Sequence, residues 1–144
     1  LELEKPQNIY LAGEKVTGTL NVTCSGTDIK VRSIHLDILG QAIVNWKELK
    51  HYGSKNSYWK TYSSEESYIN VKHKSLINDA LFRFNNGMSK ARGHIKLTEG
   101  AYSFPFTFVL PHNLPTTFSS YNTGSIVYTL TGTVDCPWYF GNLK

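Results

Sequence analysis

Apolar and polar residues alternate with a period of two along residues 16–24, 34–46, 104–110 and 126–138. Successive side chains of a β-strand point to opposite faces, so this alternation predicts strands with one buried and one exposed face. The run over 34–46 is longer than an average strand. We expect it to bend or bulge at Gly40, where the missing Cβ lets a strand twist from one sheet towards another.

The segments between these strands carry turn-forming residues. Residues 46–70 predict a β-hairpin, because Gly and Asn lie in its tip at 51–57. We expect 85–93 to form a loop and 112–124 to form a turn-rich crossover. Apolar residues do not recur at helical spacing, although 75–84 has room for a short helical turn. The prediction is an all-β fold, a two-sheet immunoglobulin-like β-sandwich.

Two of the predicted strands carry distinctive core residues. The three phenylalanines from Phe104 to Phe108 share the inward face of their strand, and Pro105 on the other face favours an edge strand or a bulge. Cys24 and Cys136 also lie on inward faces, either as buried thiols or as a disulfide between the sheets. Because the sequence opens without a secretory signal, we expect thiols.

Composition narrows the class of protein. The chain has 144 residues, enough for one domain, with 13% aromatic and 18% charged residues and no apolar run long enough for a membrane span. The formal net charge of +4 is unevenly distributed, because residues 47–96 carry ten basic and four acidic side chains. A basic segment of this kind attracts anionic partners, and it is equally compatible with a solvated lysine-rich loop.

Catalytic, cofactor and metal signatures are absent from the sequence. The five histidines and two cysteines are not spaced as zinc ligands, and no nucleophile or phosphate-loop motif occurs. We therefore expect no enzyme activity, no cofactor and no metal. Lysines and aromatic residues alternate over 47–62, as in some single-strand binders, but the chain has only three arginines. This scarcity argues against nucleic acid as a partner.

Protein binding is the remaining hypothesis for the central hairpin. Loops and hairpins on a rigid sandwich are common places for binding residues. The predicted contact group combines cationic and aromatic side chains: Lys47, Lys50, Lys55, Tyr58, Trp59 and Lys60. An alternative from a different class is an extracellular carbohydrate-binding β-sandwich, with Tyr58, Trp59 and Tyr62 as the sugar platform.

Several motifs resemble those of the arrestins, and most closely the α-arrestins, or arrestin-domain-containing proteins. The resemblance covers most of the chain and corresponds to the N-terminal arrestin domain, so we expect residues 1–144 to be this single domain, taken from a longer two-domain chain. The matching segments are Tyr10, Gly13, Glu14, Val16 and Gly18, similar to Y-x-x-G-E-x-V-x-G; residues 100–111, similar to G-x-Y-x-F-P-F-x-F-x-L-P; and Val31–Ile34, Gly40, Trp46, 114–118, 124–128, Pro137 and Trp138.

The resemblance implies an adaptor that binds cytoplasmic segments of membrane receptors or transporters and directs endocytosis, trafficking and ubiquitination. It implies a cytoplasmic protein recruited to the plasma membrane and endosomes, with peripheral contact to anionic membrane as a further expectation. Family members recruit WW-domain ubiquitin ligases through P-P-x-Y motifs in a tail, and none occurs within 1–144. A coat subunit resembling the arrestin-fold component of retromer is the alternative within the same fold.

The sequence also departs from the family pattern. Paired phosphate-sensing lysines of receptor-binding arrestins have no counterpart in the stretch from Leu1 to Lys5, and Val127 replaces the arginine of G-x-I-R-Y. The 47–60 hairpin takes the position of the loop that receptor-type arrestins insert into a receptor, with a different sequence. The role of this hairpin is therefore expected from its position alone.

Overall fold

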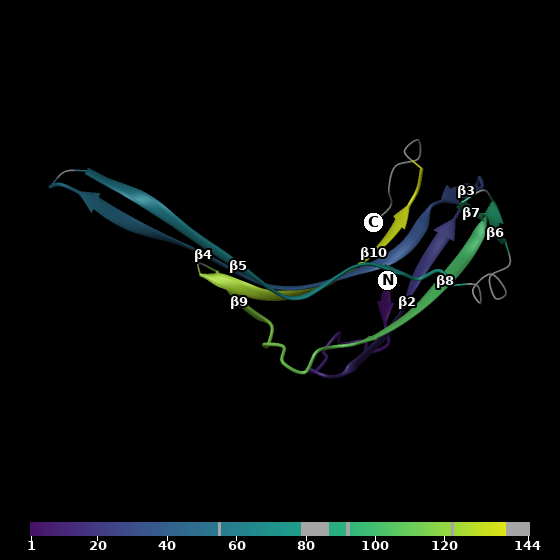
Figure 1. Ribbon diagram of the computed structural model, residues 1–144, viewed down its shortest axis with the longest axis horizontal. Helices are drawn as coiled ribbons and strands as arrows, with labels where there is room; N and C mark the ends of the chain where they lie inside the picture. Colours follow the sequence, from purple (N-terminus) through teal and green to yellow (C-terminus); the bar gives the residue numbers. More distant parts are fainter. Residues whose placement is uncertain (55, 79–86, 92, 122, 138–144) are drawn as a thin grey trace. The chain divides into compact units, whose positions relative to one another are not determined.

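The computed structural model describes residues 1–54, 56–78, 87–91, 93–121 and 123–137. Within them the fold is all-β, which confirms the predicted class (Figure 1). The strands are β1 (Glu2–Leu3), β2 (Lys15–Cys24), β3 (Ile29–Val31), β4 (Ser33–Tyr52), β5 (Asn56–Ser75), β6 (Met88–Ala91), β7 (His94–Leu97), β8 (Gly100–Val109), β9 (Phe118–Ser120) and β10 (Gly124–Asp135).

The strands form three hydrogen-bonded sheets in the orders β1-β2-β8, β3-β7-β6 and β5-β4-β10-β9. The chain divides into two compact units. Unit 1 comprises residues 1–37, 72–114 and 130–144, and unit 2 comprises 38–71 and 115–129. The long strands β4, β5 and β10 each contribute residues to both units. In the described residues no helix is long and apolar enough to cross a membrane.

The core of unit 1 is a β-sandwich built from the predicted alternation. β2 pairs with β8 antiparallel along its whole length, and this register puts Leu20 opposite Phe104. Phe104 is fully buried, and Leu20 lies under β10, because a Cβ added to Gly132 would come within 2.7 Å of Leu20 Cδ1. Burial of each large apolar side chain contributes about 1.5–3 kcal/mol, so the packing of Leu20 and Phe104 between the sheets stabilises unit 1.

Details of the predicted strands are partly confirmed. Pro105 lies on β8, an edge strand of its sheet, where a missing N–H leaves no gap in the ladder. Phe104 and Phe106 are buried, but the prediction for Phe108 was wrong, since its side chain is only half-buried. It lies near the end of β8, under the ammonium group of Lys74, 5.7 Å from its ring centre.

Three predictions for connecting segments need correction. The expected crossover 112–124 contains β9, which pairs with the start of β10. The expected loop 85–93 contains β6, whose Met88 is buried, while residues 85, 86 and 92 lie outside the described residues. Of the 75–84 segment, residues 76–78 are irregular and 79–84 are outside the described part. The missed strands are three or four residues long, too short to show a period.

Gly40, where the sequence predicts a bend or bulge, lies within a single long strand. β4 continues from Ser33 to Tyr52 without ending at Gly40. A Cβ at this position would lie 2.5 Å from the ring of Tyr128 on β10, so the glycine makes room for an aromatic ring. The Tyr128 hydroxyl donates a 2.7 Å hydrogen bond to the Pro115 carbonyl, which fixes the ring in place.

Candidate functional site

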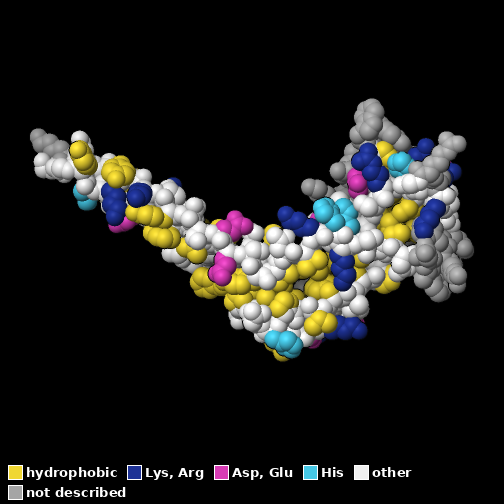
Figure 2. All heavy atoms as spheres, viewed as in Figure 1, with side chains coloured by type: hydrophobic (Ala, Val, Ile, Leu, Met, Phe, Trp, Pro, Cys, Tyr) yellow, Lys and Arg dark blue, Asp and Glu magenta, His cyan; other side chains and the backbone are white. Residues whose placement is uncertain are grey.

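The main candidate site is the hairpin formed in unit 2 by the outer parts of β4 and β5, residues 43–62. Large apolar side chains are exposed along it, including Trp59, which is 66% exposed, and Tyr52 and Tyr58. Figure 2 shows lysine and hydrophobic side chains interspersed along these strands. Contiguous exposed apolar surface of this kind marks an interaction site more often than a packing defect.

One side of the hairpin, which we call the stacked face, is held by one contact between β4 and β5 and by contacts within each strand. Trp46 stacks on Tyr62 with ring centres 5.1 Å apart, and the Lys60 ammonium lies 4.9 Å from the Tyr62 ring centre. Glu48 accepts a 2.6 Å hydrogen bond from Lys50 on the same side. This bond chiefly lowers the pKa of the Glu48 carboxyl and raises the pKa of Lys50.

The other side of the hairpin borders an open groove of about 1260 Å³. On a strand alternate residues share a face, so Lys47 and Trp59 point away from Lys50 and Lys60. Trp46 borders the groove as well as stacking on Tyr62. The remaining lining comes from Ile43 and Asn45 of β4, from residues 119–121 and 123 of β9 and its turn, and from Gly124 and Ser125 at the start of β10.

The groove depends on the β9–β10 turn, which the sequence prediction treated as an irregular crossover. The backbone N–H of Asn45 donates a 3.1 Å hydrogen bond to the Thr123 carbonyl, tying the turn to β4. A Cβ on Gly124 would lie 2.6 Å from the Ile43 carbonyl, so a larger residue cannot sit there. Tyr121 is fully exposed at the rim. In the sequence, the pair Ser120–Tyr121 close to Gly124 is the signal that could have indicated this turn.

The structure divides the predicted contact group. Lys47 and Trp59 lie in the groove, whereas Lys50 and Lys60 belong to the stacked face. Tyr58 belongs with them, because it lies two residues before Lys60 on β5 and so shares its face. Lys55 lies outside the described residues. The five described residues of the group therefore do not form one surface, because neighbouring residues of a strand point to opposite faces.

The alternation of side chains along β5 also argues against the carbohydrate-binding alternative. Tyr58 and Trp59 are adjacent on β5 and point to opposite faces. One side of the Tyr62 ring is covered by Trp46 and its ring is also approached by Lys60. The three rings do not form a common platform on which a sugar could stack.

A second polar arrangement, in unit 1, explains the Y-x-x-G-E motif. Glu14 accepts a 2.9 Å hydrogen bond from the Leu11 backbone N–H and forms an ion pair with Lys5. These bonds lower the pKa of the Glu14 carboxyl, the Lys5 bond contributing most. Gly13 donates its N–H to the Pro111 carbonyl at 3.0 Å. The motif therefore closes the loop before β2 against the end of β8.

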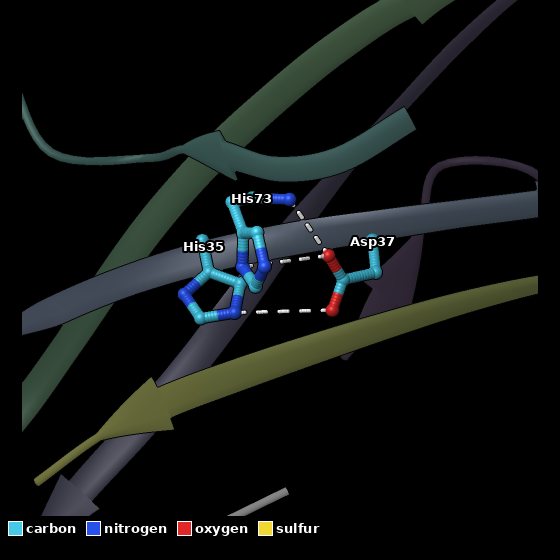
Figure 3. Close-up of side chains that lie close together, drawn as sticks. All are labelled: His35, Asp37 and His73. Atoms are coloured by element: carbon cyan, nitrogen blue, oxygen red, sulfur yellow. Dashed lines mark hydrogen bonds and ion pairs between the residues drawn. The ribbon is translucent and has the colours of Figure 1, made fainter. Parts of the chain in front are cut away.

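A third arrangement brings together His35 and Asp37 of β4 and His73 of β5, all in unit 1 (Figure 3). Their donor atoms lie within 4.8 Å of one another, with His35 Nε2 3.8 Å and His73 Nδ1 4.0 Å from the Asp37 carboxylate. The sequence expectation of no metal site rested on local spacing, and His73 is 36 residues from Asp37. These are the described side chains best arranged to hold a cation.

The fold and the Tyr10–Glu14 arrangement define an arrestin-type N-terminal domain. The chain belongs to this family: the family model described as arrestin (or S-antigen), N-terminal domain, matches residues 1–144. Arrestin domain-containing protein 17 of Caenorhabditis elegans is 28% identical over 138 residues, covering 94% of this chain. The chain spans 29% of the length of that relative.

A solved structure is also similar to this chain. The sporulation control protein Spo0M of Bacillus subtilis aligns with 94% of this chain and 41% of its own, with 18% identity and a TM-score of 0.46. The family resemblance inferred from the motifs is thus confirmed by the family match. Arrestin-family proteins are adaptors rather than enzymes, and membership supports an arrestin-type adaptor role in general.

Proposed function

We propose that this domain is the cargo-binding part of an adaptor that contacts cytoplasmic segments of membrane receptors or transporters. Its role is to direct their endocytosis, trafficking and ubiquitination from the cytoplasm, at the plasma membrane and endosomes. The ubiquitin ligase is recruited through a P-P-x-Y tail outside residues 1–144. The observation that carries the proposal is the exposed aromatic groove beside Lys47 in unit 2, together with family membership.

The lining of the groove supports an extended peptide as the ligand. Trp59 and Tyr121 offer apolar area, and aromatic residues of this kind often dominate binding energy at protein interfaces. Lys47 adds a positive charge that favours an acidic residue or the anionic membrane surface beside the cargo. Among the described lysines of the contact group, Lys50 is paired with Glu48 and Lys60 with a ring, so Lys47 is the cation best placed to meet a partner.

The test is a comparison of the two hairpin faces. Lys47→Glu combined with Trp59→Ala alters the groove, and Lys50→Glu combined with Lys60→Glu is the matched control on the stacked face. Each protein would be titrated against labelled cytoplasmic segments of receptors and transporters at low and high salt. Circular dichroism would establish that each variant is folded, as expected for exposed positions.

We expect the groove variant to bind at least about 30-fold more weakly, the effect of losing roughly 2 kcal/mol at an interfacial aromatic residue. The control should bind within about threefold of the wild type, as is usual for charges at an interface rim. If only the control variant loses binding, the binding site lies on the stacked face and not in the groove. If both variants bind as the wild type does and salt has no effect, the hairpin is not the binding site. If the protein binds only phosphatidylserine vesicles, the partner of the groove is the membrane and not the cargo segment.

A further inference from the structure

We propose that His35, Asp37 and His73 form a binding site for a divalent transition-metal ion, with Zn²⁺ as the best match. Two imidazoles and one carboxylate are ligands that zinc takes in proteins, with water in the remaining position. Magnesium and calcium prefer all-oxygen sites, so the two imidazoles select against them. The site is separate from the groove and independent of the proposed cargo function.

His35 is oriented before any ion arrives. Its side chain is buried, and its Nδ1 lies 3.3 Å from the Ser33 hydroxyl. The hydrogen bond to Ser33 occupies Nδ1 and leaves Nε2 directed at Asp37, 3.8 Å from Oδ2. A second group bonded to the far nitrogen of a ligand histidine is the usual way that proteins fix the tautomer and orientation of the ring.

His73 reaches the site through an unusual backbone conformation. Its φ is +56°, in the left-handed region that residues other than glycine seldom adopt. In this conformation its N–H donates a 2.7 Å hydrogen bond to Asp37 Oδ1, while its Nδ1 lies 4.0 Å from the same oxygen. Strained residues of this kind concentrate at functional sites. This left-handed residue within β5 thus brings the histidine ring to the carboxylate and leaves Asp37 Oδ2 for an ion.

An ion would have to draw the ligand atoms together. Zinc bonds to nitrogen and oxygen are about 2.0–2.2 Å long, so tetrahedral ligand atoms are about 3.3–3.6 Å apart. The three donor atoms lie within 4.8 Å of one another, and the distances of 3.8 and 4.0 Å run to different oxygens of Asp37, so the widest separation must close by up to about 1.5 Å. His73 can make the adjustment, because its side chain is 74% exposed and its ring meets that of His35 edge-on at 4.6 Å.

The surrounding charges leave room for a cation. Lys74 is next to His73 in the chain, but its ammonium donates to the Thr107 carbonyl at 2.7 Å and lies over the Phe108 ring. Asp37 supplies a negative charge to offset the ion. A bound metal would join β4 to β5 within unit 1, where the described side chains are linked by the contacts of both histidines with Asp37 and by the edge-on contact of the two rings.

The experiment is isothermal titration of the 144-residue chain with Zn²⁺ alone at neutral pH, with thermal unfolding as a second readout. His73→Ala removes an exposed ligand and Asp37→Asn removes the charge, so both variants avoid the buried His35. His51→Ala in the hairpin is the matched control, an exposed histidine outside the cluster. We expect one ion per chain and a raised melting temperature for the wild type, at least a tenfold weaker affinity for the two ligand variants, and an unchanged control.

Substitution of Co²⁺ identifies the ligands independently. A visible spectrum of a nitrogen and oxygen site, without a sulfur-to-metal charge-transfer band, is expected. A sulfur band would assign the ion to Cys24 and Cys136 and overturn the proposal. Equal zinc affinity in the wild type and His73→Ala, or no binding by the folded wild type, would overturn it as well. Cargo binding by the groove is measured separately, so the two proposals fail independently.

Discussion

Replacing Gly13 with alanine tests the account of the Y-x-x-G-E motif. Gly13 has φ +81°, a left-handed conformation, and donates its N–H to Pro111. A Cβ built on it would lie 2.2 Å from Nδ1 of the His112 ring, far inside van der Waals contact. The substitution therefore imposes two separate costs, one on the backbone and one on the packing of His112.

The two costs are of similar size. The left-handed conformation costs alanine about 1–2 kcal/mol, offset by about 0.4–1 kcal/mol because alanine also restricts the unfolded chain. His112 is exposed, so its ring can move aside, and a side chain held off its preferred rotamer costs about 0.5–1.5 kcal/mol. We expect Gly13→Ala to destabilise the domain by about 2 kcal/mol, of which about 1 kcal/mol is the backbone cost.

Two further variants separate these costs. Gly26 has φ +90° with nothing within 4 Å of its missing Cβ, so Gly26→Ala isolates the backbone cost. His112→Ala combined with Gly13→Ala removes the clash. In urea unfolding with a slope of about 2 kcal/mol/M, the midpoint should fall by about 1 M for Gly13→Ala and about 0.5 M for Gly26→Ala. Equal effects of the two glycine substitutions, or no relief from His112→Ala, would refute the reasoning.

Two other predictions follow from shifted pKa values. Because the pKa of Glu14 is lowered, chiefly by Lys5, its stabilising effect is present above the unfolded value of about 4.3 and is lost as pH falls through the folded value. Urea unfolding of Glu14→Gln and wild type should therefore converge at low pH, and a constant difference would contradict this. Burial raises the pKa of Cys24 and Cys136, so their stabilisation is complete below about pH 8.5 and declines above it. A thiol reagent at pH 8 should label both cysteines only after unfolding, and an absence of reactive thiols in the unfolded protein would indicate a disulfide instead.

The period-two pattern predicted most of the fold because it reports burial directly. In β2 the alternating residues Val16, Gly18 and Leu20 are all buried, and in β4 the same holds for Ile34, Leu36 and Ile38. The pattern continues to Trp46, which is 43% exposed. Alternation identifies the residues that share a face, but whether another part of the fold covers that face depends on tertiary structure.

The short strands and the metal cluster were beyond the sequence pattern for different reasons. Three or four residues cannot establish a period, so β6, β7 and β9 were missed although Met88, Ile95 and Leu97 are buried. The cluster depends on β5 meeting β4 at His35 and Asp37 and on a left-handed His73. The spacing of residues in the sequence shows neither which distant strands pair nor which residue adopts a left-handed backbone conformation.

The hairpin illustrates why charge along a sequence differs from charge on a surface. Residues 47–60 read as a single cationic cluster, yet neighbouring residues on a strand face opposite ways. Lys50 is neutralised by Glu48 on the stacked face, while Lys47 borders an aromatic groove completed by residues of β9, about 70 positions later in the chain. The hairpin therefore suits a partner that binds one cation beside aromatic rings better than a partner that requires a continuous positive surface. This distinction makes a paired substitution on each face more informative than reversing every lysine at once.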